Sequence, residues 1–304
     1  MILVSGASGL LGSNLMLAAS DRGHTVEGLF FRQAIQDPGF KMHCLDLRDR
    51  DATRSMIDEL RPEWIVHCAA QTNVDWCELH PLQAMSLNAD STRLLAERAR
   101  AVGARLVFIS TDAVFDGRRG GYVESDRTNP VNVYAASKLG GELAIREIGD
   151  NFLILRTSIY GWNATNKKSL AEWFLDCLEL GQEVPGLVDV VGSLILVNDL
   201  SDIILDLIEM NAAGTFHSGA KDSCSKYEFG RSIARVFGIS ADQVIPSRVE
   251  SLRLGATRPK NTSLNCDLVE KCLGRPMPSI ESGLMRFREL RSSEFRRRLR
   301  SAAL

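Results

Sequence analysis

The chain opens with MILVSGASGLLGSNL, residues 1–15, and this stretch decides the fold. Residues 1–4 are a short apolar run, which is typical of a fully buried strand. Residues 10–17 then repeat apolar side chains with the approximate period of a helix that packs on that strand. Three glycines, each three residues apart, stand at the junction of the two patterns: Gly6, Gly9 and Gly12.

The three glycines have different expected roles. Gly6 permits a tight turn after the strand, Gly9 lets a pyrophosphate approach the backbone, and Gly12 lets helix and strand pack closely. Free N–H groups at the start of the helix bind anions, so the stretch predicts a dinucleotide site. The spacing is G-x-x-G-x-x-G rather than the usual G-x-G-x-x-G. From this stretch alone, a glycine-rich turn without a ligand is the alternative.

Size and composition are those of an ordinary globular protein. The chain has 304 residues, 45% of them hydrophobic and 24% charged, and a net charge of −2. It is long enough for a large core, in one domain or two lobes. The small net charge favours neither a nucleic-acid nor a membrane-surface partner. No apolar run approaches the ~20 residues that span a bilayer. Because the first strand begins at Met1, we expect no signal peptide.

The seven cysteines are odd in number and form no C-x-x-C motif. This usage predicts reduced thiols in a cytoplasmic protein rather than a disulfide framework. The five histidines show no zinc-ligand spacing with the cysteines, so we predict no metal site.

Strand and helix patterns alternate through the first half of the chain. After the first strand, the patterns predict strands at 25–31, 41–44, 64–70, 105–110 and 152–156, and helices at 51–60, 82–102 and 133–148. This alternation predicts an α/β fold, a Rossmann-type doubly wound parallel sheet with helices on both faces. Ligands of such sheets bind at the carboxyl ends of the strands.

The alternation loosens after residue 158. Helices are predicted at 167–180, 199–211 and 226–237, with a strand at 214–217 and two helices closing the chain. We expect an NAD(P)-binding domain from residues 1–160 plus about 190–220. Residues from about 161–189 and 221–304 would form a smaller C-terminal substrate-binding lobe. The basic tail RSSEFRRRLRSAAL predicts a solvated helix end, or alternatively an oligomer contact such as a homodimer's.

The end of the second strand indicates which dinucleotide binds. An acid there holds the ribose hydroxyls of NAD, whereas a base favours the 2′-phosphate of NADP. Arg32 lies at this position, 20 residues after Gly12, and its guanidinium suits phosphate geometry. We therefore expect NADPH, with NADH possible, unless Arg32 is simply a surface residue. Asp46, after the third strand, is expected either to accept from the adenine amino group or to be an acid in a helix's first turn.

The segment Asn132-Val-Tyr134-Ala-Ala-Ser-Lys138 places a tyrosine and a lysine on one helix face. A lysine beside a phenol is expected to lower the tyrosine pKa from its usual ~10. The tyrosine could then give its proton to a carbonyl oxygen as hydride reaches the carbon. Thr111, after the strand at 105–110, could donate to the same oxygen. An exposed helical pair without a role is the alternative for Tyr134 and Lys138.

Several segments together resemble the extended branch of the short-chain dehydrogenase/reductase superfamily. Within it, they resemble the dTDP-4-dehydrorhamnose reductases and their relatives. The resemblance covers nearly the whole chain and is carried by GASGLLG at 6–12, HCAAQTNVDWCE at 67–78 with LN at 87–88, STDAVFDG at 110–117, NPVNVYAASKLGGE at 129–142 and RPKNTSLN at 258–265.

The resemblance implies NAD(P)H-dependent reduction of the C4 ketone of a nucleotide-linked 4-keto-6-deoxysugar. It implies the catalytic set Thr111, Tyr134 and Lys138. The cofactor-binding residues that it implies are Gly6, Ser8, Gly9, Leu10, Leu11, Gly12, Arg32, Asp46, Leu47, Cys68, Ala69, Ala70, Asn88, Tyr134 and Lys138. The substrate-binding residues that it implies are Thr72, Asp112, Val114, Phe115, Tyr134 and Arg258.

Three departures from the family pattern fall near the expected sugar pocket. Ile159 follows Arg156-Thr157-Ser158, where a tryptophan is typical. The segment Gly192-Ser-Leu-Ile-Leu196 replaces a small residue followed by Pro-Thr, and Ala113 stands where a tyrosine is common. The departures do not change the expected reaction type, but they are compatible with a substrate that carries a different sugar or nucleotide.

Two other readings share the resemblance. Extended-branch epimerases and dehydratases carry the same loop and Tyr/Lys pair. A dehydratase, however, needs a glutamate after Asp112, and Arg32 disfavours the tightly held NAD(H) of an epimerase. The regulatory β-subunit of methionine adenosyltransferase binds NADP and a partner enzyme. The intact set of Thr111, Tyr134 and Lys138 favours an enzyme over that reading.

Overall fold

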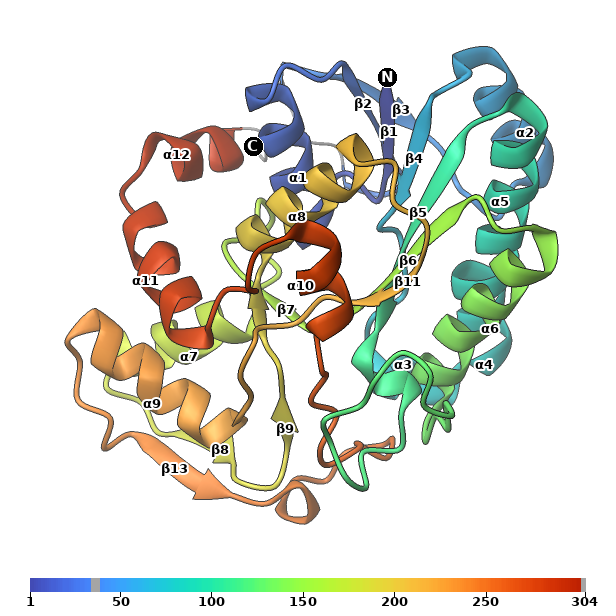
Figure 1. Ribbon diagram of the computed structural model, residues 1–304. Coiled ribbons are helices and arrows are strands. Elements are labelled where there is room, and N and C mark those ends of the chain that lie inside the picture. The colour runs from blue at the N-terminus through green and yellow to red at the C-terminus, as the bar shows by residue number, and fades with distance from the viewer. Residues whose placement is uncertain (34–38, 302–304) are drawn as a thin grey trace.

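A seven-stranded parallel sheet forms the centre of the protein (Figure 1). The computed structural model describes residues 1–33 and 39–301. The strand order is β11-β6-β5-β4-β1-β2-β3, and every neighbouring pair is parallel. The strands are β1 (Ile2–Ser5), β2 (Val26–Phe30), β3 (Lys41–Cys44), β4 (Trp64–His67), β5 (Arg105–Thr111), β6 (Phe152–Thr157) and β11 (Gly214–His217). The predicted Rossmann-type sheet is confirmed, and its order reverses between β1 and β4, where ligands of such sheets bind.

Helices cover both faces of the sheet (Figure 1). On one face α1 (Leu10–Asp21) packs against α8 (Val197–Glu209), over a core that includes Val4 and Val66. The other face carries α2 (Arg50–Leu60), α5 (Ser91–Val102) and α6 (Val133–Ile148), over a core that includes Leu3 and Phe108. Burial on both faces explains why β1, β4, β5 and β6 contain continuous apolar runs.

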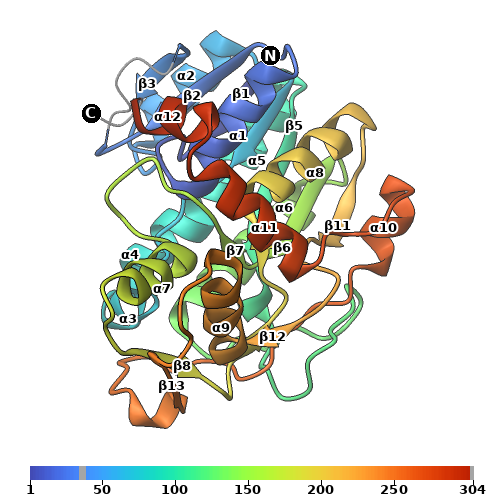
Figure 2. The same cartoon turned by 90° about the vertical axis from the view of Figure 1, so that its left-hand side faces the viewer.

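A third hydrophobic cluster lies outside the sheet, around Phe174, Phe229 and Phe287. Its helices are α7 (Leu170–Glu179), α9 (Lys226–Phe237) and α11 (Ile280–Leu290), next to the parallel pair β8 (Val184–Leu187) and β13 (Val244–Ser247) (Figure 2). Two further short pairs join β7 (Ile159–Tyr160) to β10 (Ile195–Leu196) and β9 (Val191–Gly192) to β12 (Cys224–Ser225). The remaining short elements are α3 (Val74–Leu79), α4 (Pro81–Met85), α10 (Asp267–Leu273), α12 (Glu294–Ser301) and the 3₁₀ turns Asp112–Val114 and Val249–Ser251.

The single helix predicted at 82–102 is interrupted. α4 ends at Met85, a π-turn spans Ser86–Asp90, and α5 begins at Ser91. The buried Asn88 side chain lies in this turn and accepts from the Gln71 backbone N–H at 2.8 Å. The same amide donates to the Ser137 hydroxyl of α6 at 2.9 Å. A π-turn is a common way to redirect one side chain within a helix, and periodicity alone does not reveal it.

The described part of the basic tail, helix α12, packs against the body of the protein, in contrast to the expected solvated helix end. Leu299 of α12 is only 1% exposed, and Phe295 packs on the third cluster. Arg298 donates to Asp21 of α1 at 2.9 Å, and the Arg296 guanidinium lies 3.5 Å from the centre of the Trp162 ring. The Phe295 and Leu299 face of this helix is therefore used within the chain.

A buried ion pair fastens α6 to the sheet. Glu142 of α6 accepts from the Ser110 hydroxyl of β5 at 2.6 Å and from Arg156 Nη2 of β6 at 2.8 Å. The Glu142 side chain is 0% exposed and the Arg156 side chain 2% exposed. Burial raises the pKa of Glu142, but the hydrogen bonds and charge of Arg156 hold it below its usual value overall.

We expect Glu142→Gln to lower the free energy of unfolding by about 3–5 kcal/mol, because it leaves a buried guanidinium without its counter-charge. Urea titration measures the change. Glu147→Gln is the matched control on the same helix, since Glu147 pairs with Arg93 at the exposed surface, and such pairs contribute little. Equal effects of the two substitutions would contradict this account.

Candidate active site

Two cavities of about 530 Å³ each lie at the carboxyl edge of the sheet. The Tyr134 cavity is lined by the glycine loop, Thr111, Tyr134, Lys138 and residues of the segments 157–169 and 258–259. The Asp46 cavity is lined by the same loop, the ends of β2 and β3, and residues 68–71. The two share Gly6, Ser8, Gly9, Gln33, Cys68 and Ala70. They therefore form one continuous trench across the point where the strand order reverses.

The glycine loop forms the floor between the two cavities. Gly6 adopts φ +67°, and a Cβ there would lie 2.7 Å from the Ala69 nitrogen. A Cβ on Gly12 would lie 2.2 Å from the Gly6 oxygen, so the helix can pack here only with glycine. Gly9 caps α1 without a side-chain hydrogen bond. The first amides of the helix are therefore available to an anion such as a dinucleotide pyrophosphate.

Two guanidinium groups lie at the Asp46 end of the trench. Arg32 and Arg48 both line that cavity, each 5.6 Å from the centre of the Phe31 ring. Arg48 Nη2 donates to Asp46 at 2.6 Å, and this hydrogen bond lowers the pKa of the Asp46 carboxyl. Positive charge thus accumulates beside the end of β2, where a 2′-phosphate would lie in this type of sheet.

Thr111, Tyr134 and Lys138 line one wall of the Tyr134 cavity. Thr111 ends β5, and α6 presents Tyr134 and Lys138 one turn apart. The start of α6 is fixed by Asn132, whose side chain accepts from the Ala135 N–H at 2.9 Å. The spacing of the tyrosine and lysine in the sequence therefore brings both side chains into the cavity that the strand-end hydroxyl also lines.

The expected lowering of the Tyr134 pKa is wrong for this structure. Burial raises the pKa of Tyr134 to about 12, although the Thr111 hydroxyl opposes the shift. Burial also lowers the pKa of Lys138 to about 7. The Lys138 ammonium lies 4.0 Å from the centre of the Phe108 ring. The sequence argument considered the charge of the lysine, whereas the loss of water around both groups has the larger effect.

The substrate-side residues divide into two groups. Thr72 and Arg258 line the Tyr134 cavity with Asp112, and Arg258 Nη2 donates to Asp75 at 2.8 Å. Val114 and Phe115 are 0% exposed and line neither cavity. They were expected along the substrate pocket, but the 3₁₀ turn after Thr111 directs them into the core. There the Phe115 ring stacks on Tyr122 with centroids 4.2 Å apart.

The cofactor-side residues show a similar division. Ser8, Leu10, Leu11, Leu47 and the segment 68–70 all contact the trench. Asn88 lines neither cavity and braces residue 71 against α6 instead.

Several cavity residues were not found from the sequence. Lys167 donates from Nζ to the Thr72 hydroxyl at 3.0 Å, which closes one side of the Tyr134 cavity. The sequence feature that could have revealed Lys167 is its position shortly before the capping box Ser169-x-x-Glu172. The start of a helix after a sheet's carboxyl edge is a frequent place for ligand contacts. Other residues missed are Gln33, Arg48, Trp76, Thr157, Ser158, Asn163 and Lys168.

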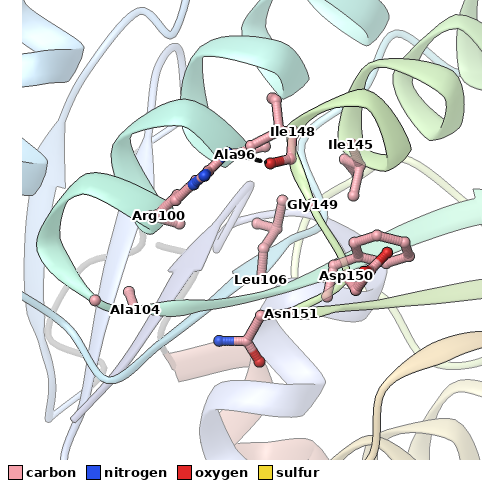
Figure 3. A pocket seen from close by; sticks show the side chains of 12 residues that line it. Ala96, Arg100, Ala104, Leu106, Ile145, Ile148, Gly149, Asp150 and Asn151 are labelled. Carbon is pink, nitrogen blue, oxygen red and sulfur yellow. Dashed lines mark hydrogen bonds between the residues drawn. The ribbon is translucent and has the colours of Figure 1, made fainter.

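A third hollow, of about 280 Å³, lies away from the trench, around the ends of α5 and α6 and the starts of β5 and β6 (Figure 3). Its lining is largely apolar, including Leu106, Ile145 and Ile148. Arg100 is already engaged by the Ile148 carbonyl. The hollow therefore offers no acid–base pair comparable to the one in the trench.

Within residues 1–33 and 39–301, no group of three or more His, Cys, Asp or Glu side chains is arranged to hold a metal ion. None of the helices in that part of the chain has the length and apolar character needed to cross a bilayer.

A family model described as the RmlD substrate binding domain matches residues 1–291. The chain belongs to this family. The RmlD-family chain is 31% identical over 287 residues to the probable low-salt glycan biosynthesis reductase Agl14 of Haloferax volcanii, covering 92% of this chain and 95% of that protein. It is 32% identical over 276 residues to methionine adenosyltransferase 2 subunit beta of Bos taurus, covering 88% of this chain and 81% of that protein.

Among solved structures, the dTDP-4-dehydrorhamnose reductase of Bacillus anthracis in complex with NADP matches the RmlD-family chain with a TM-score of 0.85 and 31% identity. The match covers 95% of this chain and 98% of that one. These findings confirm the expected family and fold and place the chain among the NAD(P)H-dependent oxidoreductases. NADP in the Bacillus anthracis structure agrees with the cofactor expected from Arg32.

We expect Lys138→Met to stabilise the protein without cofactor, most strongly near neutral pH. The pKa of Lys138 is about 7 in the fold, against 10.5 for an exposed lysine, so between pH 7 and pH 10.5 the unfolded chain binds one proton more than the folded chain. The free-energy cost of burying the charged lysine is greatest below pH 7, falls as the pH rises, and vanishes above pH 10.5. The stability gain should therefore shrink by about 1.4 kcal/mol per pH unit across that window.

Urea unfolding of both proteins at several pH values measures this difference. Lys41→Met is the control, because Lys41 is exposed on β3 and its replacement should give a small difference. A gain for Lys138→Met that does not change with pH would show that the lysine charge is not the cause.

Proposed function

We propose that this RmlD-family protein reduces the C4 ketone of a nucleotide-linked 4-keto-6-deoxysugar with NADPH. The observation that carries the proposal is the meeting of Thr111, Tyr134 and Lys138 on one wall of a cavity that continues into the glycine-loop trench. A dinucleotide bound in the trench would lie on one side of this wall and would leave the Tyr134 cavity for a sugar.

The three side chains can manage the proton of such a reduction. NADPH, when bound, supplies the hydride. The raised pKa of Tyr134, about 12, keeps the phenol protonated at neutral pH. The phenol releases its proton when negative charge develops on the ketone oxygen. The proton moves from the Tyr134 oxygen to that oxygen, giving an alcohol, and the tyrosine is then reprotonated from solvent. Thr111 donates to the same oxygen, and Lys138, with a pKa of about 7, adds positive charge to this wall when it is protonated.

A second candidate, a non-catalytic regulatory subunit, is favoured by the match to methionine adenosyltransferase 2 subunit beta over 88% of the chain. Such a protein would bind NADPH and a partner enzyme but would not reduce a sugar ketone. Turnover therefore separates the two candidates.

The deciding experiment follows the loss of reduced-nicotinamide absorbance, with NADPH and NADH in parallel, against a freshly made dTDP-4-keto-6-deoxysugar. Assays with and without a 3,5-epimerase determine which sugar series is accepted. Rapid oxidation supports the reductase. Tight NADPH binding without oxidation of any nucleotide-linked 4-keto sugar supports the regulatory subunit.

We expect Tyr134→Phe to lower kcat roughly 100-fold or more while leaving the NADPH Kd near its wild-type value, because it removes only the proton donor. Steady-state kinetics and fluorescence titration with NADPH measure the two quantities. Tyr227→Phe is the control, since Tyr227 accepts from Arg231 on α9, away from the trench. A kcat like that of the wild type in Tyr134→Phe would rule out this proton donor.

We expect Arg32→Ser to weaken NADPH binding about 10-fold, the loss of one charge-assisted contact to phosphate, with little effect on NADH. Kd values for both nucleotides test this expectation. Arg54→Ser on α2 is the control, because Arg54 pairs with Asp51 outside both cavities. Equal losses for NADPH and NADH would show that Arg32 does not contact the 2′-phosphate.

A further inference from the structure

We propose that Thr262 is a positioning residue that orients the Thr111 hydroxyl through the carboxyl group of Asp112. The proposal rests on the proposed function, because it concerns the hydroxyl that holds the ketone oxygen. Thr262 lies 150 residues after Asp112 in the chain and lines neither cavity.

Both oxygens of Asp112 are held by threonine hydroxyls. Thr262 Oγ1 donates to Asp112 Oδ2 at 2.5 Å, and Thr111 Oγ1 donates to Asp112 Oδ1 at 3.1 Å. Thr111 Oγ1 also accepts from the Ala113 N–H at 3.2 Å. In the protein without substrate, the single proton of the Thr111 hydroxyl is therefore directed to Asp112, and it turns to the ketone oxygen when the sugar binds. Until then the position of the hydroxyl depends on where the carboxyl group lies, and Thr262 holds the far side of that carboxyl group.

The backbone of Thr262 is fixed on both sides. Its N–H donates to the Val191 carbonyl at 3.0 Å, and the Val191 N–H donates to the Lys260 carbonyl at 2.7 Å. One residue further back, the Asn261 N–H donates to the Gly117 carbonyl at 2.9 Å. The Thr262 hydroxyl is thus presented from a rigid segment rather than from a mobile loop.

The same segment reaches every element that carries the proposed chemistry. We call residues 256–265 the strap. Its Ala256 N–H donates to Asp75 of α3 at 2.9 Å. Its Thr257 carbonyl accepts from Asn132, the residue that caps α6, at 2.9 Å. Through Thr262 it also reaches the end of β5. The strap therefore fixes the relative positions of Thr111 and the start of the Tyr134 helix.

The other groups around Asp112 act on it more weakly than the two threonine hydroxyls. Burial raises the pKa of the Asp112 carboxyl group, and the Ala113 N–H opposes this shift less than either threonine does. Lys226 at the start of α9 favours the charged carboxylate at a distance, but it forms no ion pair in the described part of the chain. Tyr134 also faces this carboxyl group. On the remaining side, a Cβ built on Gly192 would still lie 3.7 Å from Asp112 Oδ2. The Gly192 backbone is therefore not packed tightly against this oxygen, and Asp112 also borders the Tyr134 cavity, so the carboxyl group can change its orientation once Thr262 releases it.

The test compares three variants with the wild-type protein. Thr262→Val removes the hydroxyl but keeps the branched shape, and Thr262→Ser keeps the hydroxyl. Ser263→Ala is the matched control on the strap, because the Ser263 hydroxyl bonds to Gly121 and Asn261 rather than to Asp112. Each variant is measured for kcat and KM on the sugar turned over by the wild type, for NADPH Kd and for Tm, and its crystal structure is determined.

We expect Thr262→Val to lower kcat roughly 10- to 100-fold, the usual effect of a displaced reacting group. The NADPH Kd should be unchanged, and the Asp112–Thr111 hydrogen bond should be lost in the crystal. Thr262→Ser should restore both kcat and the bond, and Ser263→Ala should keep both.

Three results would overturn the proposal: an intact Asp112–Thr111 bond in Thr262→Val, a wild-type kcat in that variant, or an equal fall of kcat in Ser263→Ala. If the wild type reduces no sugar, the proposed function fails. The crystal structures then decide separately whether Thr262 orients Asp112 and Thr111.

Discussion

The contact between Glu142 and the two strands β5 and β6 is the constraint on which the candidate site depends. The buried carboxylate of Glu142 accepts hydrogen bonds from Ser110, Arg156 and Arg146. It thereby fixes the rotation and height of α6 over the sheet. Since Tyr134 and Lys138 lie on the preceding turns of that helix, their distance from Thr111 follows from this anchor. Glu142 and Arg156 are buried, so their contact lies in the core rather than among the surface loops around the trench.

The burial that strengthens the Glu142 contact also shifts the pKa values of two groups on the preceding turns of α6. Lys138 and Tyr134 both hold pKa values shifted towards their neutral forms. Near neutral pH the burial of Lys138 destabilises the fold, whereas Tyr134 is neutral in both the folded and the unfolded chain. A ligand that supplies charge or hydrogen bonds can change the pKa values of both groups. The wall of the Tyr134 cavity therefore combines a rigid frame with titratable groups that a substrate can influence.

Much of this was predictable from the sequence, because local patterns determine local structure. Asn132 and Gly149 bound α6 as a cap and a breaker would, so its limits matched the predicted 133–148. The meeting of glycine loop, strand-end hydroxyl and tyrosine helix followed from the common carboxyl edge of parallel strands. The π-turn at Asn88, the inward course of Phe115 and the pKa of Tyr134 depend on tertiary packing, which periodicity does not encode. Thr262, one of the two hydroxyl partners of Asp112, lies 150 residues away in sequence.

The strap has a consequence for the order in which the protein matures. During synthesis, Thr262 leaves the ribosome 150 residues after Asp112. The glycine loop, Thr111 and Tyr134 also emerge well before it. Domains begin to fold as the chain emerges, so the sheet can assemble first while the strap is still missing. Contacts so distant in sequence form slowly. The nascent chain therefore forms its sheet early and completes the wall of the Tyr134 cavity last. A chain whose synthesis stopped before residue 256 would lack Thr262, and its Asp112 carboxyl group would lack that hydrogen-bond partner.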